Sequence, residues 1–291
     1  MGLYQELKSH FYLQNAYKDW ENYRNTLTNY LIQEVDQIEI PLSSLESMTE
    51  EALPTLAILG AGACNDIDLR KLEPYFSKIT LIDNDFKALQ QALNTYQLDN
   101  NCTFELCHRS INGIMEENYQ NFCEELQFFL RESEKPITAN SFTDFAISLL
   151  DTYYGEADSC RLELGLNSYD YIWCFGVHSQ LQSMFSYIFH TFSMHLNQGI
   201  LQGDECDEIV FSNRLKLENQ RFIAPFHDML LKATKKTLFI GNEQGSIEGA
   251  YQAIIDIQNR NLDLTEGVVM WPFHPTQNIS YEMLVQKIKR S

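Results

Sequence analysis

Basic residues are scarce in this chain of 291 residues. It has 21 lysines and arginines against 40 aspartates and glutamates, which gives a formal net charge of −19. Such a charge repels polyanions, because nucleic-acid binding needs clustered Lys and Arg that release counterions from the phosphates. An anionic membrane surface would repel the chain in the same way. We therefore expect neither nucleic acid nor a membrane surface among its partners.

Long apolar runs are also missing. No run approaches the roughly 20 residues that cross a bilayer. Segment 1–17 lacks the basic stretch followed by an apolar stretch that marks a signal peptide. Gly2 is followed at position 6 by Glu6, and not by the Ser or Thr of a myristoylation signal. These absences predict a protein without a membrane anchor.

Paired cysteines are absent as well. The seven cysteines are odd in number, scattered along the chain, and show no C-x-x-C spacing. This usage is typical of a reduced protein with free, mostly buried thiols, so we expect a cytoplasmic location. Neither the cysteines nor the histidines show the spacing of zinc ligands, and no metal site is predicted.

What the chain does have is an alternation of strand and helix patterns. Apolar runs that end in Gly or Asp are typical of strands buried on both faces, and segments of helical periodicity separate them. This succession predicts parallel strands joined by right-handed crossovers. The expected strands lie at 55–62, 78–85, 101–110, 169–176 and 235–243, and the helices at 65–76, 86–98, 181–199, 213–234 (with a break at Pro225) and 246–260.

Two regions stand outside this rhythm. Residues 1–36 carry apolar and aromatic side chains at helical spacing, and 111–168 contains two helical stretches. We expect an N-terminal helical cap over 1–50, a main domain over 51–291, and a helical insertion at about 111–168. The tail 266–290 is compatible with a β-hairpin or with a final helix.

Two of only 13 glycines lie two residues apart in the segment 56–69, LAILGAGACNDIDL. Gly60 and Gly62 separate the first strand from a helical pattern for which Asn65 is a suitable N-cap, with Asp66 and Asp68 in the first turn. Such a turn brings backbone N–H groups toward a bound group, at the place where doubly wound sheets bind ligands. The alternative is that the glycines only permit a tight turn.

The next strand ends in two acids, about 20 residues after the glycines, where an acid can accept both hydroxyls of an adenosine ribose. Asp83 directly follows the apolar run and is the better ribose ligand. Asp85 is better placed to cap the helix that begins near Phe86. A solvated strand end is the alternative for Asp83.

The turn lacks the marks of phosphate binding. Asn65 stands where the dinucleotide fingerprint G-x-G-x-x-G has its third glycine, and no G-x-x-x-x-G-K-[ST] occurs. Acids and amides after the turn suit a ligand with a ribose and a cationic amino-acid end, which is S-adenosylmethionine. An NAD-dependent oxidoreductase is the less favoured alternative.

Three segments carry a family resemblance. AILGAGACND (57–66), LIDND (81–85) and YDYIWCFGVHSQL (169–181) resemble the first motif, the second-strand acid and the fourth-strand motif of class I S-adenosylmethionine-dependent methyltransferases. The resemblance covers 55–181. It implies an α/β, Rossmann-like fold, with a mostly parallel seven-stranded sheet whose last strand is antiparallel and with helices on both faces.

The resemblance also implies S-adenosylmethionine as cofactor and methyl transfer to a small molecule or a peptide group. A binding protein that keeps the nucleoside site without catalysis is the alternative. The residues that the match places at the cofactor are Gly60, Ala61, Gly62, Asn65, Asp66, Asp83, Asn84, Phe175 and Gly176.

His178 is the candidate catalytic residue. It lies just beyond the fourth strand, in a loop that faces the methyl-transfer centre in the resembling family. A neutral histidine there could remove a substrate proton near pH 7. The alternative is that it only hydrogen-bonds the loop. Ser179 and Gln180 are polar enough to line the same pocket, and the helical regions 1–36 and 111–168 are expected to cover it.

Overall fold

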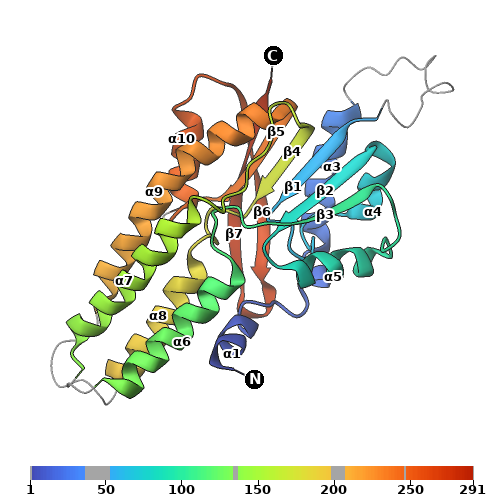
Figure 1. The fold of residues 1–291 in the computed structure, drawn as a ribbon. Coiled ribbons are helices and arrows are strands. Elements are labelled where there is room, and N and C mark those ends of the chain that lie inside the picture. The colour runs from blue at the N-terminus through green and yellow to red at the C-terminus, as the bar shows by residue number, and fades with distance from the viewer. Residues whose placement is uncertain (1, 37–52, 134–136, 198–206, 246, 291) are drawn as a thin grey trace, which may run out of the picture.

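A seven-stranded sheet forms the centre of the computed structural model, which describes residues 2–36, 53–133, 137–197, 207–245 and 247–290 (Figure 1). Its order is β3-β2-β1-β4-β5-β7-β6. The strands are β1 (Thr55–Leu59), β2 (Lys78–Asp83), β3 (Phe104–His108), β4 (Tyr169–Phe175), β5 (Thr234–Glu243), β6 (Asp263–His274) and β7 (Ile279–Lys289).

The first five strands are parallel, and β7 runs antiparallel to both β5 and β6. The prediction of a mostly parallel seven-stranded α/β sheet with an antiparallel last strand is therefore confirmed, and the tail forms a hairpin. The chain proceeds outward from β1 to β3 and then returns to β4 on the other side of β1. The carboxyl ends of β1 and β4 thus flank a topological switch point, where open α/β sheets bind ligands.

Helices cover both faces of the sheet. Alternate side chains of β1 show the division: Leu56 and Ile58 face one layer, while Ala57 and Leu59 face the other. The first layer consists of α3 (Glu21–Asp36), α4 (Leu69–Leu72) with the 3-10 turn η3 (Glu73–Tyr75), and α5 (Phe86–Tyr96). The second layer consists of α9 (Glu208–Ala233) and α10 (Ala250–Gln258).

A helical arm projects from one end of the sheet (Figure 1). It is built from α6 (Glu116–Glu132), α7 (Ala139–Ala157), α8 (Ser183–Asn197) and the N-terminal part of α9. The stretch 111–168 supplies two of these helices. The arm has its own buried cluster, rich in phenylalanine, which α1 (Leu3–Ser9) joins.

The N-terminal region is helical in three pieces, because α2 (Ala16–Asp19) separates α1 from α3. Of these, α3 packs directly on the sheet through Tyr23, Leu27 and Leu31. The expected domain boundary at residue 50 lies outside the described residues. None of the helices in the described ranges is long and apolar enough to cross a bilayer.

Two local expectations are wrong. The helix after the glycine turn starts at Leu69 and not near Asn65, because Asp68 accepts a hydrogen bond from the Lys71 N–H (3.1 Å) and acts as the N-cap. Helix α9 continues through Pro225 without a break. A proline inside a helix costs about 3 kcal/mol, and here the buried face of α9 on the sheet, with Phe222 and Phe226, offsets that cost.

Candidate functional site

The turn after β1 is tied to the end of β2. The Gly60 and Ala61 N–H groups donate to the Ile82 carbonyl at 2.9 and 3.2 Å. Gly60 and Gly62 have φ of +65° and +49°, which side-chain-bearing residues rarely adopt. The structure therefore brings together the predicted residues of the first motif and the second-strand acid.

The two glycines serve different purposes. A Cβ atom on Gly60 would lie 2.6 Å from Val177 Cγ2 in the turn after β4, so Gly60 permits the two turns to pack together. A Cβ atom on Gly62 would meet nothing within 4 Å. Gly62 therefore borders open space in which a ligand can approach the backbone, whereas Gly60 has no room for a side chain toward Val177.

Asp83 is held against this turn by backbone donors. Its Oδ2 accepts from the Gly62 N–H at 2.9 Å, and its Oδ1 accepts from the Asp85 N–H at 2.8 Å. Burial raises the pKa of this carboxyl, and the backbone hydrogen bonds oppose the rise. An ionised carboxylate has about four acceptor positions, so each oxygen keeps one for another donor.

Asp85 caps α5, as predicted. Its Oδ1 accepts from the Ala88 N–H at 3.1 Å. Its Oδ2 accepts from the Tyr12 hydroxyl at 2.6 Å and pairs with Lys8 Nζ at 3.0 Å. Lys8 also bonds Glu116 at the start of α6 at 2.8 Å. The N-terminal segment is thus anchored beside Asp83, at the end of the sheet where α1 lies in Figure 1.

The other residues predicted near the first turn differ in their surroundings. Asp66 is half-buried, and burial raises its pKa to about 6, although the Arg24 guanidinium opposes the rise. Arg24 also donates to the Asn65 carbonyl at 3.1 Å. Asn84 is directed elsewhere, because its side-chain amide donates to the Ile114 carbonyl at 3.4 Å.

The turn after β4 is bound to β5. The Gly176 N–H donates to the Gly241 carbonyl at 2.9 Å. The Phe175 ring is buried and stacks on Trp173 with centroids 3.8 Å apart. Phe175 and Gly176 therefore lie at the switch point, and the next residue, Val177, packs against the turn after β1 at Gly60.

His178 belongs to a buried hydrogen-bond chain. Its Nδ1 lies 2.9 Å from the Asn242 side-chain amide, and its Nε2 lies 3.0 Å from Nε2 of His227. His227 Nδ1 lies 2.7 Å from Asp256 Oδ2, which also accepts from Arg260 Nε at 2.7 Å. Burial, and then the neighbouring His227, lower the pKa of His178 to about 3.

This chain leaves His178 without a free nitrogen. Asn242 Oδ1 can only accept, so His178 Nδ1 donates to it, and a neutral His178 then has only Nε2 as an acceptor, which faces His227 Nε2. The ring is also only 1% exposed. The geometry therefore disfavours His178 as a base that takes a substrate proton, and it favours the alternative, a histidine that fixes the loop.

Sequence reasoning missed three side chains here. His227 and Asp256 lie 29 residues apart on different helices, so no spacing rule connects them. Glu243 closes β5 and accepts from the Ser179 hydroxyl at 2.8 Å. Glu243 could have been found from the sequence, because it is an acid at the carboxyl end of a predicted parallel strand, as Asp83 is. Gln180 is exposed.

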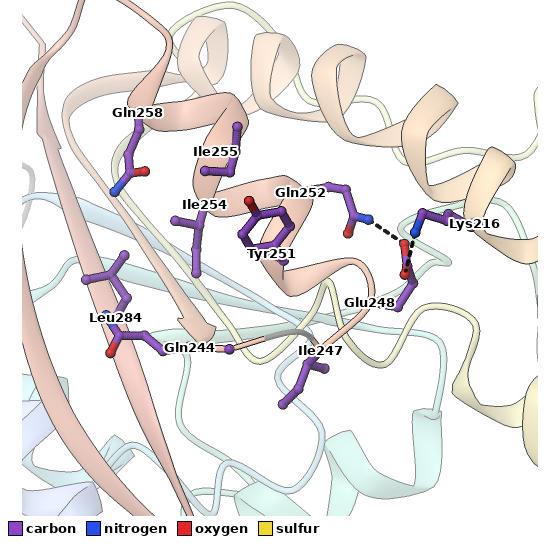
Figure 2. Close-up of a pocket in the computed structure, with 11 residues that line it drawn as sticks. Lys216, Gln244, Ile247, Glu248, Tyr251, Gln252, Ile254, Ile255, Gln258 and Leu284 are labelled. Atoms are coloured by element: carbon purple, nitrogen blue, oxygen red, sulfur yellow. Dashed lines mark hydrogen bonds and ion pairs between the residues drawn. The ribbon is translucent and has the colours of Figure 1, made fainter. Parts of the chain in front are cut away.

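The larger of the described cavities lies apart from these residues (Figure 2). It has a volume of about 550 Å³ and lies where α10, β7 and the segment after β5 meet. Figure 2 shows Tyr251, Ile254 and Ile255 of α10 along it, opposite Leu284 of β7. None of the predicted site residues lines it. In the part of the chain that the structure describes, no group of three or more potential ligands could hold a metal ion.

No protein-family model matches the chain, and no curated protein is detectably similar to it in sequence. Several solved structures resemble it. One is the N-methyltransferase NodS from Bradyrhizobium japonicum WM9 with S-adenosyl-L-homocysteine, at 14% identity over 99% of this chain and 97% of that chain, with a TM-score of 0.42. Another is magnesium protoporphyrin IX methyltransferase (ChlM) from Synechocystis PCC 6803 with bound SAM, at 8% identity over 99% and 89%, with a TM-score of 0.42.

A third is a SAM-dependent methyltransferase from Aquifex aeolicus, at 13% identity over 88% of this chain and 97% of that chain, with a TM-score of 0.36. These proteins are methyltransferases of the kind that the sequence motifs resemble. The likeness is distant, and the strand order by itself establishes the fold described above.

Proposed function

We propose that the chain is an S-adenosylmethionine-dependent methyltransferase that acts on a small molecule or a peptide group. The observation that carries the proposal is the Asp83 carboxylate, held 2.9 Å from the Gly62 N–H at the switch point of the sheet. A carboxylate oriented by backbone donors, with acceptor positions to spare, fits the two hydroxyls of an adenosine ribose.

The surrounding residues fit the rest of this cofactor. Gly62 borders open space, so the backbone can be approached closely there. Phe175 and Gly176 form the opposite wall, and Asn65 and Asp66 lie at the turn, where an acid suits the cationic amino-acid end. When bound, the cofactor supplies a methyl group already activated by its sulfonium. The protein then contributes alignment and a dry site.

The N-terminal segment provides part of that dry site in this proposal. Lys8 and Tyr12 both bind Asp85, two residues beyond the ribose carboxylate, so α1 lies across the edge of the turn. The helical arm begins beside this segment, because Lys8 also bonds Glu116 of α6. Water exclusion strengthens each electrostatic contact inside such a site.

Titration calorimetry with S-adenosylhomocysteine and with NAD tests the cofactor. We expect S-adenosylhomocysteine to bind and to raise the melting temperature, because it binds only the folded chain. NAD is expected to bind weakly or not at all, since Asn65 replaces the third glycine. Absence of both heat and a melting shift at millimolar S-adenosylhomocysteine would contradict the proposal.

A second candidate, a protein that binds the cofactor without transferring its methyl group, predicts the same titration. The disfavoured role of His178 supports it, because no base is then assigned. Incubation with S-adenosylmethionine labelled in its methyl group, together with a small-molecule and peptide extract, separates the two. Label in the extract above that seen with heat-denatured protein supports the enzyme.

A further inference from the structure

Glu243 is a buried carboxylate with one oxygen unused. It is the last residue of β5 and is only 4% exposed. Oε1 accepts from the Ser179 hydroxyl at 2.8 Å, whereas Oε2 is buried and has no hydrogen-bond partner among the described residues. Burying an ionised carboxylate is costly unless a cation or several donors balance it. Burial raises the pKa of the Glu243 carboxyl, and the described residues supply no partner for Oε2 that would favour the ionised form.

Aromatic rings gather on the face of the sheet that carries Glu243. Glu243 pairs across the ladder with Met283, which belongs to the same buried cluster as Phe175, Tyr23 and Trp271. Tyr23 stacks on Trp271 with centroids 5.9 Å apart and planes 20° from parallel. Aromatic faces attract cations, and more strongly where water is excluded.

A second carboxylate lies near the same ring. Burial raises the pKa of the Tyr23 phenol well above its ordinary value, and the charges of Asp66 and Glu243 raise it further. The charges of both carboxylates thus act on one phenol. Ser179, which bonds Glu243, is half-buried, so the group borders solvent at the turn after β4.

We propose that Glu243, oriented by Ser179, binds a positively charged nitrogen of the methyl acceptor, so that the acceptor is a cationic amine that is methylated at another atom. The inference rests on the proposed function. A carboxylate beside aromatic rings matches a protonated or quaternary amine in both charge and shape. An anionic acceptor would face Asp66 and Glu243 together, and a neutral one would leave the carboxylate uncompensated.

Choline and its uncharged isostere 3,3-dimethylbutan-1-ol test the charge preference, because the two differ in one atom and in charge. Each is titrated into the full chain, with and without saturating S-adenosylhomocysteine. We expect choline to bind at least tenfold more tightly than the isostere. Glu243→Gln should remove that preference while S-adenosylhomocysteine still binds. Glu282→Gln, the same change at an exposed position on β7, should keep it.

Ser179→Ala serves as the second variant, because it removes only the donor that orients the carboxylate. A weaker preference is expected there, and this variant decides the matter if Glu243→Gln does not fold. Equal binding of choline and the isostere, or no binding of choline at tens of millimolar, overturns the inference. So does a Glu243→Gln variant that keeps the preference or that loses only S-adenosylhomocysteine affinity. Failure of S-adenosylhomocysteine to bind the wild type counts against the proposed function instead, since choline is also titrated alone.

Discussion

The turns after β1 and β4 meet at one point of the sheet, but they are built in opposite ways. In the first, Gly62 borders open space and the Asp83 carboxylate keeps free acceptor positions. In the second, His178 is buried and both of its ring nitrogens are engaged. One turn presents unused hydrogen-bonding capacity, and the other has almost none.

This difference assigns ligand binding to the turn after β1 and structural anchoring to the turn after β4. A side chain with spare acceptors at the surface of a turn can contact a ligand, whereas a fully bonded side chain can only fix the turn that carries it. Glu243 Oε2 and Asn242 Nδ2 break the pattern on the β4 side, because both are buried without a hydrogen-bond partner among the described residues. Substitutions at the two turns should therefore change affinity on one side and stability on the other.

The largest expected effect is on affinity at the open turn. Asp83→Ala should weaken S-adenosylhomocysteine binding by at least about 100-fold, because two charge-assisted hydrogen bonds contribute roughly 1.5–3 kcal/mol each. Calorimetry measures the change. Asp99→Ala, at an exposed acid outside the site, is the control. An Asp83→Ala variant with wild-type affinity would show that the ribose is bound elsewhere.

A smaller effect is expected on stability, where substitutions of Gly60 and Gly62 should differ. Gly60→Ala should cost about 2–3 kcal/mol of unfolding free energy, because its Cβ would meet Val177 at 2.6 Å and its φ is positive. Gly62→Ala should cost about 1 kcal/mol, from the positive φ alone. Urea unfolding of both variants measures this. Equal losses would mean that Gly60 does not set the packing of the turns.

Asp85 should affect stability rather than binding. Asp85→Ala removes the N-cap of α5 and the anchor of Lys8 and Tyr12, so we expect a loss of about 1–2 kcal/mol in the free energy of unfolding. Asp85→Asn keeps a good cap and is the matched control. If S-adenosylhomocysteine affinity falls more in Asp85→Ala than in Asp83→Ala, the roles of the two acids are exchanged.

The smallest effect is a pH dependence at the closed turn. The pKa of His178 is about 3 in the folded chain and about 6.5 when unfolded. The unfolded chain therefore binds more protons, and this contribution to stability is lost as the pH falls below about 6.5. The stability difference between wild type and His178→Gln should shift by about 1 kcal/mol, against the wild type, between pH 6.5 and 5.5.

Unfolding curves at the two pH values measure this shift. Because His227 lies 3.0 Å from His178, the shift reports the titration of this pair. If the difference in unfolding free energy between wild type and His178→Gln is the same at both pH values, His178 titrates in the folded chain as it does in the unfolded chain.

Sequence patterns predicted the sheet because they are local. Strands β1, β2, β4 and β5 contain apolar runs, and an acid or a glycine marks where each of them ends. The same signal placed Asp83 beside the glycine turn and Asp85 on the next helix. The link from His178 to His227 and Asp256 could not be predicted, because it depends on how α9 and α10 pack on the sheet. The N-cap at Asp68 was missed because several polar residues in a row could each have capped the helix.

The separate core of the helical arm has a consequence for motion. Its buried cluster shares no residue with the two clusters that sandwich the sheet. A cooperative unit with its own core can open at less than the global unfolding free energy. Amide hydrogens in α6 and α7 should therefore exchange sooner than those of β1 and β4. Such partial opening would leave β1 and β4, with the turns that follow them, formed.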